Sequence, residues 1–185
     1  MTRILLDCDP GHDDAIALLL ALVLDDPEPF DAVRRDFAAA TVARGIPFHL
    51  TLLYPFASHR ELTDAVLADT RSFFATRPPL EFTLTHISVW PRVVYAVPEP
   101  EAALRECMRA LFARFPAWPP YGGLHPDVVP HATLGEDVDA ARVLPEVERR
   151  LAACLPRPCK AEEATLLEEF ALDRWRERER FPFGG

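Results

Sequence analysis

Two short segments of the chain alternate polar and apolar residues with the two-residue period of a β-strand. His49-Leu50-Thr51-Leu52 and His131-Ala132-Thr133-Leu134 each carry a histidine and a threonine two positions apart. Successive side chains of a strand point to opposite faces, so each segment would bury its apolar face and present an imidazole and a hydroxyl on the other. Two copies are more than this composition would give by chance.

Other stretches show the spacing of amphipathic helices. We expect one helix to begin with Asp26 as its N-cap and Pro27 in its first turn, to carry Phe30, Val33 and Phe37 on one face, and to end before residue 45. Further helices are predicted over residues 61–75, 98–115 and 137–151.

Strands are predicted over residues 48–54, 81–90, 93–97, 163–172 and 174–181, in addition to the second histidine segment. The last two would pair, and the alternating charges of 174–180 favour an edge strand. The apolar run 15–24 fits a buried strand or a helix. Glu168 and Glu169 are expected at the surface. Helices and strands alternate around histidine segments that lie 82 positions apart (131 minus 49), which predicts an α+β fold of two similar lobes with a central cleft between antiparallel sheets.

Composition narrows the function classes. The 185 residues suit one domain, and the net charge of −9 argues against binding long duplex nucleic acid. The four cysteines lack CxxC spacing, so we expect free thiols. The longest apolar run is too short to cross a membrane and does not follow a basic stretch, so we expect a cytoplasmic monomer without membrane contact.

The histidine pair carries the candidate chemistry. Two facing imidazoles can share general acid and general base work near neutral pH, which makes His49 and His131 the candidate catalytic pair. Tyr54 and Tyr121 lie next to the histidine segments and are candidates for stacking on a substrate, although packing in the core explains them equally well. Arg92, in the turn after Trp90-Pro91, is a candidate phosphate contact, and a solvated turn residue is the simpler alternative.

The two histidine segments, together with Tyr54-Pro55-Phe56 and Tyr121-Gly122-Gly123, resemble the two-histidine phosphoesterase superfamily, especially its bacterial 2′-5′ RNA ligase-like members. The resemblance covers residues 20–185 and implies a pseudo-symmetric, bilobal fold. It also implies hydrolysis of 2′,3′-cyclic or 2′-5′ phosphodiesters of small nucleotides or RNA ends, without a metal or other cofactor. In that scheme one histidine is the acid and the other the base, while Thr51 and Thr133 bind non-bridging phosphate oxygens.

The N-terminus resembles a different family. Residues 3–20 are similar to the N-terminal motif of inosine-uridine nucleoside hydrolases, which implies that Asp9 and Asp14 are Ca²⁺ ligands and that Asp13 contacts the ribose. That family takes further ligands from a distant C-terminal half, and nothing after Leu20 matches it. We therefore expect residues 1–16 to be an N-terminal fragment and residues 17–185 to form the phosphoesterase domain. A nucleoside hydrolase relic and a non-catalytic RNA-end or nucleotide-binding module are the alternatives.

Overall fold

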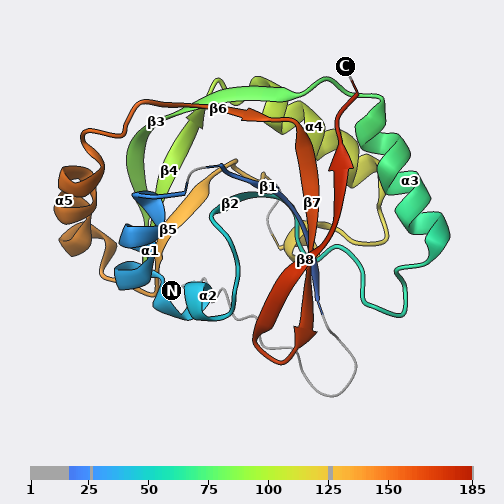
Figure 1. Ribbon diagram of the computed structural model, residues 1–185, viewed down its shortest axis with the longest axis horizontal. Coiled ribbons are helices and arrows are strands. Elements are labelled where there is room, and N and C mark those ends of the chain that lie inside the picture. The colour runs from blue at the N-terminus through green and yellow to red at the C-terminus, as the bar shows by residue number, and fades with distance from the viewer. Residues whose placement is uncertain (1–16, 26, 125–126, 185) are drawn as a thin grey trace.

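One curved antiparallel sheet runs through the protein, with helices packed on each of its two halves (Figure 1). The computed structural model describes residues 17–25, 27–124 and 127–184. The elements in chain order are β1 (Leu18–Val23), α1 (Phe30–Phe37), α2 (Ala39–Ala43), β2 (His49–Leu53), α3 (Asp64–Ala75), β3 (Leu80–Trp90), β4 (Val93–Glu99), α4 (Ala102–Arg114), a 3₁₀ turn η1 (Pro120–Gly123), β5 (Ala132–Glu136), α5 (Ala140–Leu151), β6 (Arg157–Ala161), β7 (Glu163–Ala171) and β8 (Arg174–Pro182).

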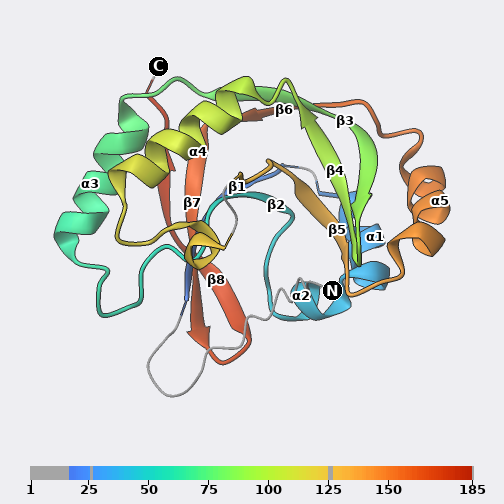
Figure 2. The same ribbon diagram turned by 180° about the vertical axis from the view of Figure 1, so that it is seen from behind.

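The strand order shows that the sheet consists of two similar halves. The eight strands follow the order β6-β3-β4-β5-β2-β1-β7-β8, so the two histidine strands, β5 and β2, meet at the centre. Helices α1 and α5 pack on one half of the sheet, whereas α3 packs on β8 and α4 on β2 (Figures 1 and 2). The predicted α+β fold of two similar lobes is therefore correct, and its centre lies where β2 and β5 meet.

The apolar run near the N-terminus forms a central strand. Leu18, Leu20 and Leu22 of β1 belong to the main core, while Leu19 and Ala21 face a smaller apolar cluster on the other side of the sheet. Both faces of β1 are covered, which explains why the run is continuously apolar and lacks the alternation of a half-exposed strand. Its pairing with β2 and β7 settles the choice between strand and helix in favour of the strand.

The predicted helices are present, but several begin later than expected. The first begins at Phe30 after Pro29, without a side-chain cap, and it is divided into α1 and α2 at Ala38; the predicted N-cap, Asp26, lies outside the described residues. Helix α4 begins at residue 102 because β4 continues to residue 99. Helix α5 begins at residue 140, where the carboxylate of Asp139 caps it. No helix in the described part of the chain is long and apolar enough to cross a membrane.

The prediction that Glu168 and Glu169 lie at the surface is wrong. Both are buried, and Glu168 is only 1% exposed. The edge strand β8 supplies the reason, because Arg176 and Arg178 each place a guanidinium nitrogen 2.6 Å from a different carboxylate oxygen of Glu168. Burial would raise the pKa of Glu168, but the hydrogen bonds from these two arginines hold it below its usual value.

Candidate active site

The two histidine strands present their polar residues on one face of the sheet. Leu50 and Leu52 of β2 are buried in the core, whereas His49 and Thr51 are half-buried on the opposite face. In β5, Ala132 and Leu134 are buried and Thr133 is half-buried. This alternation is the one expected from the sequence.

The pairing of the two strands brings the histidines and threonines together. Leu50 lies directly across from Ala132 in an antiparallel register. Continuing that register by one residue in each direction sets His49 against Thr133 and Thr51 against His131. The structure therefore brings all four predicted residues to the line where β2 and β5 meet, which is the seam between the two halves of the sheet.

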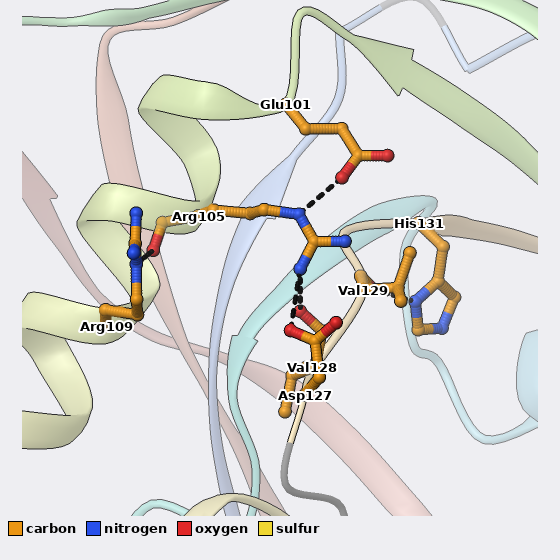
Figure 3. A network of polar contacts seen from close by, with 7 residues as sticks. All are labelled: Glu101, Arg105, Arg109, Asp127, Val128, Val129 and His131. Carbon is orange, nitrogen blue, oxygen red and sulfur yellow. Dashed lines mark hydrogen bonds and ion pairs between the residues drawn. The ribbon is translucent and has the colours of Figure 1, made fainter.

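Backbone carbonyl groups orient both imidazoles in the same way. Nδ1 of His49 lies 2.9 Å from the carbonyl oxygen of Pro47, and Nδ1 of His131 lies 2.8 Å from that of Val129 (Figure 3 shows the second contact). A carbonyl oxygen can only accept a hydrogen bond, so Nδ1 carries the proton in each ring and Nε2 has the lone pair. Nε2 of His49 lies 3.2 Å from Oγ1 of Thr51, which therefore donates to it.

Burial favours the neutral form of both imidazoles. The pKa of His49 is lowered to about 4, mainly by burial and also by the charge of Arg34, against the opposing effect of the Pro47 hydrogen bond. Burial also lowers the pKa of His131, against the hydrogen bond to Val129. Each neutral imidazole can thus accept a proton at Nε2. A bound anion would raise the pKa of either ring and stabilise its protonated form.

A pocket of about 330 Å³ opens beside His131 and contains two of the three predicted substrate contacts, Arg92 and Tyr121. Arg92 lies in the turn between β3 and β4, is largely exposed and pairs with Asp137 at 2.8 Å. The third candidate, Tyr54, is not part of the pocket lining: it packs against the small apolar cluster, with its ring 6.4 Å from that of Trp175. A larger hollow of about 540 Å³, also lined by Trp90, Pro91 and Arg92, is lined by neither histidine.

The sequence-based prediction missed two aromatic residues at the site. The ring of Trp90 lies 4.7 Å from that of His131, edge to face, and the ring of Tyr95 lies 5.7 Å from it. Tyr95 reaches this place because it pairs with Thr133 across β4 and β5. The sequence contains no signal for the register of β4 on β5, and this register places Tyr95 beside Thr133.

The candidate calcium ligands, Asp9 and Asp14, lie outside the described residues. Among the residues that are described, no group of three or more His, Cys, Asp or Glu side chains is placed to hold a metal ion.

A family model decides the relationship of this chain to known proteins. Residues 23–170 match the model of the 2′-5′ RNA ligase superfamily. The chain belongs to that superfamily. The match contains both histidine strands and the pocket beside them, and it begins after the segment that resembles nucleoside hydrolases.

Solved structures share the superfamily fold at low sequence identity. The chain is 20% identical to Escherichia coli LigT complexed with 3′-AMP, with a TM-score of 0.51 over 94% of this chain and 100% of that one. A phosphoesterase structure gives a TM-score of 0.54 at 20% identity, over 93% of this chain and 100% of the other. The protein TT0787 of Thermus thermophilus gives a TM-score of 0.55 at 23% identity, over 92% of this chain and 99% of that protein.

Curated relatives match a short piece of the chain. The pyrimidine-specific ribonucleoside hydrolases RihA of Shewanella baltica and Shewanella woodyi are 73% and 70% identical to it over 30 residues, or 16% of this chain. This chain spans about a tenth of the length of these relatives, 9% and 10% respectively. The match therefore concerns a segment and not the fold.

Proposed function

We propose that this protein is a phosphodiesterase that hydrolyses 2′,3′-cyclic or 2′-5′ phosphodiesters of small nucleotides or RNA ends. The observation that carries the proposal is the antiparallel pairing of Leu50 with Ala132. Its register carries His49 and Thr51 of one strand next to Thr133 and His131 of the other. Two imidazoles on one face, each with its Nδ1 proton bound to a carbonyl group, are suited to transfer protons on either side of one phosphorus atom.

In the proposed reaction, water attacks the phosphorus, and one histidine accepts the proton of that water at Nε2. The bond between the phosphorus and one ribose oxygen breaks, and the other histidine donates a proton to the departing oxygen. Thr51 and Thr133 hold non-bridging oxygens, where negative charge grows in the transition state. The two histidines carry out both proton transfers in this scheme, and no proposed step uses a metal ion.

The surroundings of the two histidines favour one of them as the general base and the other as the general acid. Arg34 lies close enough to His49 to lower its pKa, so its charge disfavours a protonated His49. We assign His49 as the base and His131 as the acid. A bound phosphodiester anion would favour the protonated form of His131 that this role needs.

The pocket beside His131 is the proposed place for the nucleoside. Trp90 and Tyr121 offer aromatic surfaces for a base, and a volume of about 330 Å³ is at the lower end of the range of small-molecule sites. LigT has been crystallised with 3′-AMP and with NADP⁺, which supports a small nucleotide as ligand for the present chain as well.

The test is an assay of the full chain against the four nucleoside 2′,3′-cyclic phosphates and 2′-5′ and 3′-5′ linked dinucleotides, with and without a chelator. We expect hydrolysis of the cyclic or the 2′-5′ compounds, unchanged by chelator. Failure to cleave any of them would refute the proposal, and activity abolished by the chelator would refute its metal-free mechanism.

We also propose that residues 17–185 carry this activity without residues 1–16, because the family match begins at residue 23. Release of free bases from nucleosides in a Ca²⁺-dependent reaction would instead support a function for the segment that resembles nucleoside hydrolases.

A further inference from the structure

An arginine of α4 binds the segment that leads into His131 (Figure 3). Nη1 of Arg105 donates to the carboxylate of Asp127 at 2.8 Å and to the carbonyl oxygen of Val128 at 3.3 Å. Its Nε donates to Glu101, the N-cap residue of α4. The carbonyl group of Val129, the next residue after Val128, is the one that accepts the Nδ1 proton of His131.

An arginine of α1 binds the segment that leads into His49 in the same way. Nη2 of Arg34 donates to the carbonyl oxygen of Ile46 at 2.8 Å, and its Nη1 donates to Asp31 of the same helix at 2.6 Å. The carbonyl group of the following residue, Pro47, accepts the Nδ1 proton of His49. Arg34 is only 3% exposed, so these contacts are shielded from water.

The two arrangements match residue by residue, counted back from each histidine. An arginine holds the carbonyl group three residues before the histidine, and the carbonyl group two residues before it orients the imidazole. A carboxylate in the first turn or at the N-cap of its own helix also binds each arginine.

Each arginine also crosses the seam between the two halves of the sheet. Helix α1 packs on β5 but binds the segment before β2, and α4 packs on β2 but binds the segment before β5. A charged guanidinium donating to a backbone carbonyl is a strong hydrogen bond, and it fixes the backbone at that point. Both contacts therefore hold a histidine segment in place relative to the opposite half.

We propose that Arg34 and Arg105 are a matched pair of positioning residues that hold His49 and His131 in the Nδ1–H tautomer, with Nε2 facing the site. The catalytic part of this inference rests on the proposed function. Without its arginine, a segment can shift, its carbonyl group no longer meets Nδ1, and the ring is free to rotate or to move its proton to Nε2. A displacement of about 1 Å at a proton-transfer group is enough to cost about 100-fold in rate.

The test compares Arg105→Ala and Arg105→Lys with the control Arg109→Ala. Arg109 lies one turn further along α4, is exposed, and donates to the carbonyl group of Arg105. On the other half, Arg34→Lys is compared with Arg35→Ala; Arg35 is exposed and pairs with Glu28. Lysine is the safer change at the buried Arg34, because it keeps a positive charge beside Asp31.

Two readouts separate positioning from general damage. The first is ¹⁵N NMR of the imidazole rings at pH 7.5, which reports the tautomer of each histidine and needs no substrate. The second is the kinetics of 2′,3′-cyclic AMP hydrolysis. We expect Arg105→Ala to move His131 toward the Nε2–H tautomer and to lower kcat about 10- to 100-fold, with KM changed less than about threefold. Arg105→Lys should recover part of kcat, Arg34→Lys should affect His49 and not His131, and both control variants should match the wild type.

Unchanged ring spectra and an unchanged kcat in the folded Arg105 variants would overturn the inference, even if phosphodiester hydrolysis is established. An equal shift of both histidines in each variant would overturn the one-to-one pairing. If the wild-type protein hydrolyses no phosphodiester but the ring spectra change as expected, the proposed function fails and the positioning role stands.

Discussion

On the half of the sheet that carries His131, the imidazole lies against the rings of Trp90 and Tyr95 and opens into a pocket. On the half that carries His49, the imidazole accepts a hydrogen bond from Thr51 and lies near the charge of Arg34. In both halves the carbonyl group two residues before the histidine binds its Nδ1. The same backbone arrangement therefore holds two imidazoles in chemically unlike surroundings, one aromatic and open to a pocket and the other polar and close to a positive charge.

The largest expected effect comes from removing either imidazole. His49→Ala and His131→Ala should each lower kcat/KM on 2′,3′-cyclic nucleotides by about 10²–10⁴-fold, the usual contribution of a positioned acid or base. An aryl phosphodiester with a p-nitrophenolate leaving group separates the two roles, because this leaving group needs no proton. On that substrate His131→Ala should lose much less activity than His49→Ala.

Equal losses for the two variants on both substrates would contradict the assignment of His131 as the acid. Full activity of His131→Ala on cyclic nucleotides would contradict the two-histidine scheme itself.

A smaller effect is expected from the two threonines. Thr51→Val and Thr133→Val keep the shape of the side chain and remove one donor each, so kcat/KM should fall only about tenfold per variant, because other donors remain. Thr76→Val, which removes a hydroxyl that donates to Phe73 at the end of α3, is the matched control and should leave kcat/KM unchanged. A threonine variant that loses as much activity as the histidine variants would show that the hydroxyl has a different role.

The pH dependence of stability reports the environment of His49. Its pKa is about 4 in the folded protein and about 6.5 in the unfolded chain, so the unfolded chain binds more protons between these values. The free energy of unfolding should therefore fall as the pH is lowered from 6.5 to 4, by up to about 3 kcal/mol from this one group. Denaturant unfolding of the wild type and of His49→Gln measures the contribution, and the variant should have a flatter profile.

His86→Gln is the control for that experiment, because His86 lies exposed on β3. Identical pH profiles for the wild type and His49→Gln would mean that the folded protein does not hold His49 neutral.

The smallest effect is expected from the N-terminus. Removal of residues 2–14 should leave kcat/KM on phosphodiesters within about twofold of the wild type, because the strands and backbone segments that orient both histidines lie after residue 17. The same kinetic assay and a thermal unfolding curve check this. Loss of folding, or Ca²⁺-dependent release of bases by the full chain, would show that the segment has a role of its own.

Local patterns in the sequence were enough to predict the candidate site residues and the face of each strand that they share. Alternation is a local property of an extended chain, so His49-Leu50-Thr51-Leu52 and its counterpart at 131–134 defined half-buried strands without any knowledge of their partners. The helices were predicted from their spacing for the same reason. Strand β6 was missed, because a five-residue edge strand that contains Pro158 and Lys160 has little apolar pattern of its own.

The side chains around each histidine come from distant parts of the chain and meet it only in the folded protein. Tyr95 reaches His131 through the register of β4 on β5, and this register depends on the whole sheet. Arg34 precedes its histidine by 15 residues (49 minus 34) and Arg105 by 26 (131 minus 105), so the two arginines share no spacing that a repeat in the sequence could reveal. They reach equivalent places because helices from opposite halves pack across the seam, and packing between distant segments leaves no local pattern in the chain.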